Sequence, residues 1–196
     1  DTTHVAEVKR RQKEPDELII STNDIVTSSF FVNSNCDVGF QAVNFRNRVP
    51  PAGGNHAGNY EGTVSYHRPD FETPRLIRQS VGAPMVDGKQ DGFDINTSFR
   101  RVKTGNTKLA PGFWVRRKLR CAIITNWCSF FSPVVLEGCE QQLHIPVLEV
   151  GLPTGLSIAI LYMAMPTVMA VALFEPANSA LVHNMACSGI ISGNSV

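Results

Sequence analysis

The sequence Ile123-Ile124-Thr125-Asn126-Trp127-Cys128-Ser129-Phe130-Phe131 joins an apolar run to a hydroxyl and an indole that stand two residues apart. The apolar half predicts a strand, and side chains at positions i and i+2 of a strand share a face. We therefore expect Thr125 and Trp127 to be neighbours. Hydroxyl and indole groups donate hydrogen bonds, and such donors can hold the oxyanion of an acyl transfer. The alternative is a core strand whose Trp127 only packs.

The composition is typical of one globular domain. The chain has 196 residues, of which 43% are apolar and 18% charged, and this length suits a single domain over residues 1–196 with its own core. A net charge of +1 gives no field that would attract nucleic acid, so no nucleic-acid partner is expected. The cysteines are odd in number and form no CxxC pair, which predicts buried free thiols in a reducing, cytoplasmic location. They are Cys36, Cys121, Cys128, Cys139 and Cys187.

The longest uncharged segment, residues 150–174, allows two interpretations. Part of it is long enough to span a bilayer. Proline and glycine residues, however, divide it into the runs 156–165 and 167–174. We therefore predict a buried hairpin, with a membrane span as the less favoured alternative.

Capping residues predict where two helices begin. Ser21 and Asp24 fit a capping box, in which each side chain accepts a backbone N–H of the first turn. Thr73 at the N-cap and Pro74 at the first helical position fit a second helix start. Good helix formers near the amino end predict one more helix with an exposed, basic end. The expected helices are residues 2–13, 21–32 and 75–81.

Runs with strand character alternate with these helices, which indicates a mixed α/β class. A stretch rich in glycine and polar residues, 82–112, is expected to be a long connector within the domain. The expected strands are 39–45, 60–66, 113–127 and 142–150, followed by the hairpin.

Common catalytic motifs are missing from the sequence. No histidine has the spacing of a metal site, and neither a GxSxG elbow nor a GxxxxGK loop occurs, so no metal site is expected. Cys139 and His144 suggest a thiol nucleophile, but no third residue that would orient them can be named. A structural thiol is the favoured interpretation of Cys139.

Short blocks follow one another along the chain: Ser21-Thr22-Asn23-Asp24, Asn44-Phe45-Arg46-Asn47-Arg48 with Gly58-Asn59, Thr73-Pro74 with Ile77-Arg78, and Thr125-Asn126-Trp127. In order and spacing they resemble the second half of the coenzyme A-dependent acyltransferases of the BAHD type. The same fold superfamily includes chloramphenicol acetyltransferase, the wax ester synthases and the condensation domains of peptide synthetases. The resemblance implies an α+β sandwich in which helices pack on one face of a mixed sheet. It also implies that this is one of two similar lobes around a channel.

The resemblance implies roles for single residues as well. Thr125 would stabilise the tetrahedral oxyanion, and Trp127 would shape the wall beside it. Acyl-coenzyme A is then a co-substrate, no cofactor is bound, and a small alcohol or amine accepts the acyl group. The residues expected to contact coenzyme or substrate are Arg116, Arg117 and Asn126; a solvated strand face is the alternative for the two arginines. Structural roles are expected for Ser21, Asp24, Asn44, Arg46, Arg48, Gly58 and Asn59, with a salt bridge as the alternative for Arg46 and Arg48.

The chain departs from this family in its missing base. The family carries its catalytic histidine in an HxxxD motif on the first lobe, and no histidine here has an aspartate four residues later. The DFGWG segment of the plant enzymes is also absent. The chain is therefore expected to be the second lobe of an enzyme whose first lobe lies on the same precursor or on another chain. The alternatives are a non-catalytic assembly subunit built on the same lobe and, less favoured, a jelly-roll shell protein.

Overall fold

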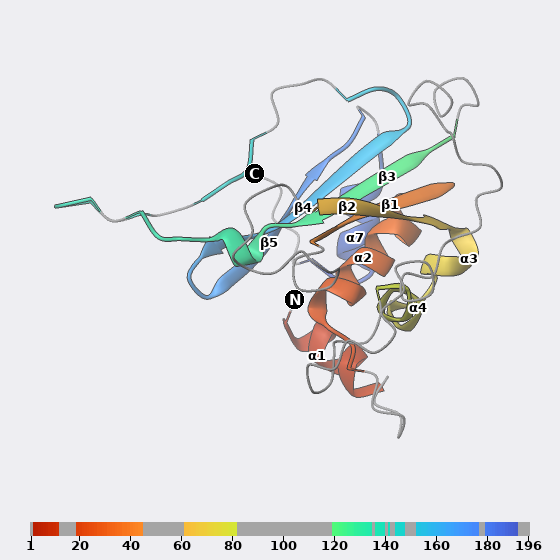
Figure 1. Ribbon diagram of the computed structural model, residues 1–196, viewed down its shortest axis with the longest axis horizontal. Coiled ribbons are helices and arrows are strands. Elements are labelled where there is room, and N and C mark those ends of the chain that lie inside the picture. Colours follow the sequence, from red (N-terminus) through yellow and green to blue (C-terminus); the bar gives the residue numbers. More distant parts are fainter. Residues whose placement is uncertain are drawn as a thin grey trace, which may run out of the picture.

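The computed structural model describes residues 2–11, 19–44, 61–81, 119–134, 136–139, 141, 144–147, 152–176 and 179–191. Within them, one five-stranded mixed sheet has the strand order β2-β1-β3-β4-β5 (Figure 1). β3 lies at its centre, parallel to both β1 and β4, while β2 and β5 are the antiparallel edge strands. The strands are β1 (Val38–Asn44), β2 (Glu61–His67), β3 (Cys121–Asn126), β4 (Leu156–Met165) and β5 (Val168–Phe174).

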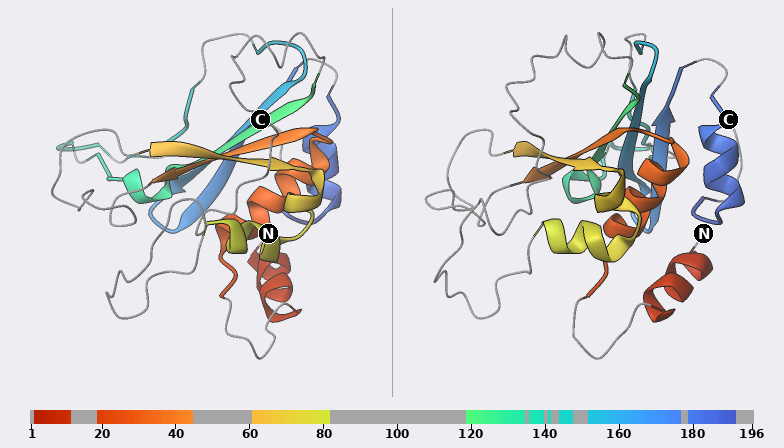
Figure 2. Two further views of the ribbon diagram at one scale, coloured as in Figure 1. Left: turned by 45° about the vertical axis from the view of Figure 1, so that its right-hand side comes forward. Right: turned by 90° about the vertical axis from the view of Figure 1, so that its right-hand side faces the viewer.

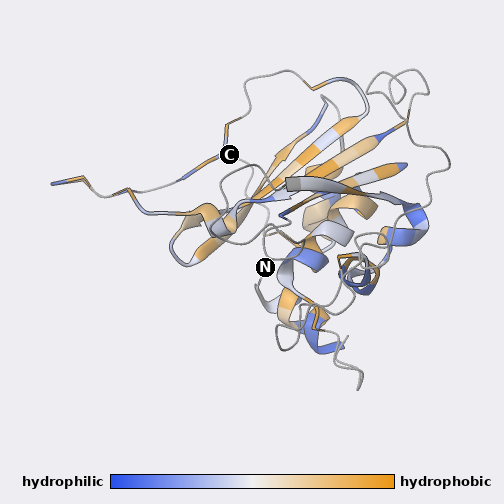
Figure 3. Cartoon of the chain, in the orientation of Figure 1, coloured by the Kyte–Doolittle hydropathy of each residue, from blue (hydrophilic) through white to orange (hydrophobic). Residues whose placement is uncertain are grey.

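Helices α2, α4 and α7 lie on the same side of this sheet, as the two turned views make clear (Figure 2). The described helices are α1 (Thr2–Arg11), α2 (Thr22–Asn33), α3 (Arg68–Phe71), α4 (Pro74–Ser80) and α7 (Leu181–Cys187), with a short 3-10 helix η1 (Cys128–Phe130) after β3. The strands at the centre are coloured mostly as apolar, whereas α3 and the end of α1 are hydrophilic (Figure 3). A mixed sheet with helices on one face confirms the expected α+β class.

The predicted helix starts are confirmed. The Ser21 side chain accepts the N–H of Asp24, and the Asp24 carboxylate accepts the N–H of Ser21 at 2.7 Å, so the capping box of α2 is complete. At α4, the Thr73 hydroxyl accepts the N–H of Leu76, and Pro74 occupies the first turn, where its missing N–H costs nothing. Both helices therefore begin where local sequence places them.

The core lies between α2 and the sheet. Phe31 stands at its centre, with ring centroids 5.7 Å from Phe30, 5.7 Å from Tyr66 and 5.3 Å from Phe71. All four side chains are fully buried. Gly39 of β1 lies directly beneath Phe31, because a Cβ at this glycine would stand 2.8 Å from three ring atoms. The absence of a side chain there allows α2 to approach the sheet closely.

The predicted hairpin is present as β4 and β5, and none of the described helices is long and apolar enough to cross a membrane. The prediction that the whole hairpin is buried is wrong for β5, whose first residues are exposed. Two strand predictions also need correction. The strand expected over 113–127 covers only Cys121–Asn126 among the described residues, and residues 144–147 are irregular rather than part of a strand over 142–150.

Candidate functional site at the end of β3

The carboxyl ends of the three parallel strands meet at one edge of the sheet, which is where open α/β sheets bind their ligands. Gln41 is paired with Ile124, so Asn44, three residues on, ends β1 at about the level of Trp127. α2 begins beside the same edge, since Asn23 accepts a hydrogen bond from Asn126. The carboxyl end of β3 and the start of α2 therefore lie together at this edge of the sheet.

Thr125 lies on the face of the sheet that points away from the helices. Ala122 and Ile124 of β3 are buried in the helix-side core, at 0% and 1% exposure, so alternation along the strand puts Thr125 on the other face. Its side chain is half-buried. Among the described residues, its hydroxyl has no hydrogen-bond partner. The Thr125 O–H is thus available to donate to a group that approaches this face.

Trp127 follows the strand and remains exposed. Its backbone N–H donates to Leu161 O at 2.7 Å, which keeps it beside β4, but its φ of −104° and ψ of 7° end the extended conformation. The residue is 40% exposed. Neither Thr125 nor Trp127 is therefore fully buried. A purely structural role for both residues would require that they were.

Asn126 points toward the helices, opposite to Thr125. Its Nδ2 donates to Asn23 Oδ1 at 3.1 Å, and its Oδ1 accepts the N–H of Cys128 at 2.9 Å. The second bond is an Asx turn, in which an asparagine side chain binds the backbone two residues on. Asn126 thus shapes the end of β3, and its expected contact with substrate or coenzyme stays a prediction.

Aromatic side chains accompany Thr125 on its face of the sheet. Thr125 pairs with Ile160 in register, so Tyr162, two residues further along β4, lies on the same face. The His144 ring stands edge-on to Tyr162 at 6.2 Å, and Phe131 lies 6.0 Å from His144. Burial raises the pKa of the Tyr162 phenol, so its O–H stays protonated at neutral pH. The sequence did not predict a place for Tyr162 beside Thr125, and it suggested His144 only as a partner of Cys139.

The thiol of Cys128, just after β3, is not activated as a nucleophile. Burial raises the pKa of the Cys128 thiol, which keeps it protonated. His144 contacts Phe131 and Tyr162, whereas His183 of α7 lies 3.5 Å from Cys187 Sγ. The expectation of buried thiols is wrong for Cys139 and Cys187, which are exposed. No group of side chains suited to a metal ion occurs in the described ranges.

Some predicted site residues lie outside the described residues. These are Arg46, Arg48, Gly58, Asn59, Arg116 and Arg117, and the connector 82–112 lies there too. Ser21 and Asp24 form the capping box of α2, and Asp24 in addition binds Arg78 of α4.

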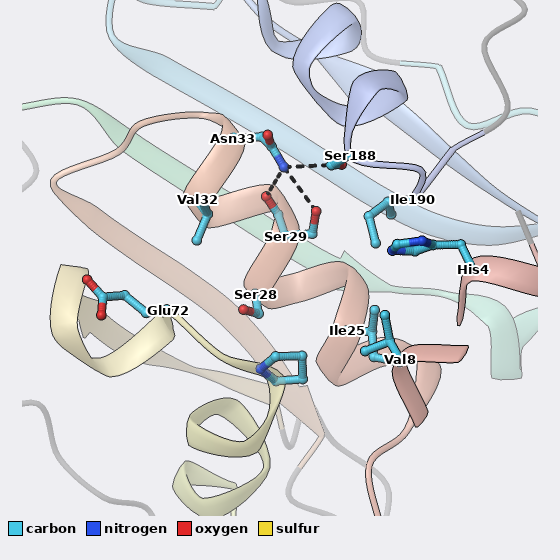
Figure 4. Close-up of a pocket in the computed structure, with 11 residues that line it drawn as sticks. His4, Val8, Ile25, Ser28, Ser29, Val32, Asn33, Glu72, Ser188 and Ile190 are labelled. Atoms are coloured by element: carbon cyan, nitrogen blue, oxygen red, sulfur yellow. Dashed lines mark hydrogen bonds between the residues drawn. The ribbon is translucent and has the colours of Figure 1, made fainter. Parts of the chain in front are cut away.

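A pocket of about 310 Å³ opens elsewhere, on the helical side, between α1, α2 and the residues after α7 (Figure 4). Several of its polar groups bind one another: Asn33 Nδ2 donates to Ser29 O at 2.8 Å and reaches Ser188 Oγ at 3.5 Å. Ser28 donates to Phe71 O. With these groups satisfied internally, the pocket is best explained as a gap between packed helices.

Comparisons with protein-family models, with curated proteins and with solved structures gave no match for this chain. The resemblance carried by its short sequence blocks therefore rests on those blocks alone.

Proposed function

We propose that this chain is the carboxyl-terminal lobe of a coenzyme A-dependent acyltransferase with a chloramphenicol acetyltransferase-like fold. One observation carries the proposal: Thr125, at the carboxyl end of the central parallel strand, has a half-buried hydroxyl without a hydrogen-bond partner among the described residues, on the face of the sheet away from the helices. Helices α2, α4 and α7 lie on the opposite face (Figure 2), and in this proposal the second lobe packs on the face that holds the hydroxyl. A cytoplasmic location belongs to the same proposal.

The reaction divides between the two lobes. A histidine of the first lobe takes the proton from the O–H or N–H of the acceptor, and the acceptor then attacks the thioester carbonyl. Thr125 donates its hydrogen bond to the oxyanion that forms, with Trp127 as the wall beside it. When the tetrahedral intermediate collapses, the C–S bond breaks and the coenzyme leaves as a thiol that receives the proton.

The proposal is tested with the whole enzyme, either the full-length polypeptide or this chain with the subunit that copurifies with it. Thr125→Val keeps the shape of the side chain and removes the donor, and loss of one oxyanion donor costs about 3 kcal/mol, a hundredfold or more in kcat. Thr63→Val is the matched control, because Thr63 is an exposed threonine of the edge strand β2 on the same face of the sheet. Equal turnover in Thr125→Val and wild type refutes the oxyanion role.

A second candidate is a non-catalytic assembly subunit, which the exposed apolar side chains after β3 favour. Phe130, Val134 and Leu136 are 59%, 61% and 61% exposed, and apolar side chains grouped in this way usually meet a partner. A whole assembly that binds through this surface but transfers no acyl group from any thioester supports this candidate. The jelly-roll alternative fits poorly, since β3 pairs in parallel on both sides whereas jelly rolls are antiparallel.

A further inference from the structure

The amide of Asn126 is fixed in one orientation by two hydrogen bonds. The N–H of Cys128 needs an acceptor, so the amide oxygen must face it, at 2.9 Å. The amide nitrogen then faces Asn23, whose Oδ1 accepts its hydrogen at 3.1 Å. Without an acceptor at Asn23, the half-buried Asn126 nitrogen would lose its partner, and the amide would be free to turn away from Cys128.

Asn23 is itself held firmly, because it lies in the first turn of α2. That turn is closed by the capping box of Ser21 and Asp24 and tied to α4 by Arg78, whose Nη2 lies 2.6 Å from Asp24 Oδ2. The acceptor that Asn23 offers is therefore preorganised before Asn126 reaches it.

We infer that Asn23 is a positioning residue of the candidate acyl-transfer site. It orients Asn126, and Asn126 holds the turn at Cys128. This turn sets the positions of Thr125 and Trp127 at the end of β3. This inference rests on the proposed function and deepens it: a residue of the helical layer, 103 positions away from Asn126 in sequence, sets the geometry on the catalytic face. A displacement of about 1 Å at a reacting group is enough to lower a rate strongly.

Two substitutions separate the hydrogen bond from the packing around it. Asn23→Leu keeps a side chain of similar size and removes the acceptor. Asn23→Asp keeps an acceptor oxygen, and a carboxylate in the first turn of a helix is well tolerated. Asn23→Ala removes the same acceptor with a good helix former and takes over the test if Asn23→Leu does not fold.

The matched control is Thr22→Ala, one residue away in the same turn. The Thr22 hydroxyl accepts a hydrogen bond from Lys9 Nζ of α1 at 3.0 Å. This variant therefore removes a bond between α1 and α2 and leaves the bond between Asn23 and Asn126 in place. It is expected to keep kcat and amide exchange within twofold of wild type.

The experiment measures acyl transfer and amide hydrogen exchange on the same full-length enzyme or assembly. We expect Asn23→Leu to lower kcat at least tenfold, with the KM for the thioester within twofold, and to speed exchange of the Cys128 amide. Asn23→Asp should restore both values. Unchanged kcat and unchanged exchange in Asn23→Leu, or no recovery in Asn23→Asp, overturn the inference. If the wild type transfers no acyl group, the proposed function fails, and the catalytic part of this inference fails with it; the exchange data then report on the turn alone.

Discussion

Arg78 of α4 and Asp24 of α2 form an ion pair between residues 54 positions apart. The Arg78 Nη2 lies 2.6 Å from Asp24 Oδ2, and its Nε donates to the same oxygen at 2.8 Å. That oxygen also accepts the N–H and the O–H of Ser21, each at 2.7 Å. With the Asp24 side chain only 1% exposed, a single carboxylate oxygen joins the start of α2 to α4.

Replacing Arg78 by methionine should strongly destabilise the protein. The Asp24 carboxylate would stay buried without its counter-charge, which typically costs about 3–5 kcal/mol. Urea unfolding measures the loss in free energy of unfolding. Arg11→Met is the control, because Arg11 pairs with Glu7 at an exposed site, where an ion pair contributes less than about 1 kcal/mol. Similar losses in the two variants would contradict the prediction.

Gly39→Ala should destabilise by overpacking. The new Cβ would meet the Phe31 ring at 2.8 Å, and Phe31 has no room to move because Phe30, Tyr66 and Phe71 surround it. We expect a loss of about 1–3 kcal/mol in urea unfolding. Adding Phe31→Leu to Gly39→Ala should cost less than the sum of the single changes, because the smaller side chain relieves the clash. Strict additivity would show that the two residues do not compete for this space.

Stability should fall at alkaline pH, in part through Cys36. Burial raises the pKa of this thiol from 9.0 to about 11. The unfolded chain therefore loses the proton first, so the contribution of Cys36 is complete below about pH 9 and is lost as pH rises to about 11, at up to about 1.4 kcal/mol per pH unit. Urea unfolding across this range should give a shallower decline for Cys36→Ala than for wild type. Cys187→Ala, at an exposed thiol, should decline like wild type.

Trp127→Ala should affect substrate use more than folding. Since Trp127 is 40% exposed, loss of its side chain should change the free energy of unfolding by about 0.5 kcal/mol or less. In the whole enzyme, we expect the KM for the acceptor to rise several-fold while Trp127→Phe retains most of the affinity. Phe130→Ala, at a 59% exposed position after β3, is the control. An unchanged acceptor KM in Trp127→Ala would remove Trp127 from the site.

Features that depend on neighbours in sequence were predicted well. The caps at Ser21 and Thr73 each involve a backbone N–H three residues later, so the sequence contains all of the information. By contrast, α7 was not predicted, because Ala180 offers no side-chain cap and the helix is short. Its stability comes from the burial of Leu181 and Met185, at 1% and 0% exposure, in the core built by other elements.

Features that depend on distant contacts could not be read from the sequence. Residues 142–150 were expected to form a strand, but Pro146 lacks an N–H and residues 144–147 are irregular. Thr125 and Trp127 were chosen as candidate site residues from their spacing in a strand, but β3 ends at Asn126, so only Thr125 lies within it. The bond between Asn23 and Asn126, and the approach of His144 to Tyr162, arise only when the sheet brings separate segments together.

The outer strand β5 affects how this chain behaves in concentrated solution. Val168–Phe174 contains no charge and no proline, and its outward backbone groups have no partner strand in the described sheet. Natural edge strands usually carry a lysine, a proline or a bulge that blocks pairing with another molecule. Molecules of this protein should therefore associate through β5 at high concentration, and Met169→Lys, at one of its exposed positions, should keep them monomeric.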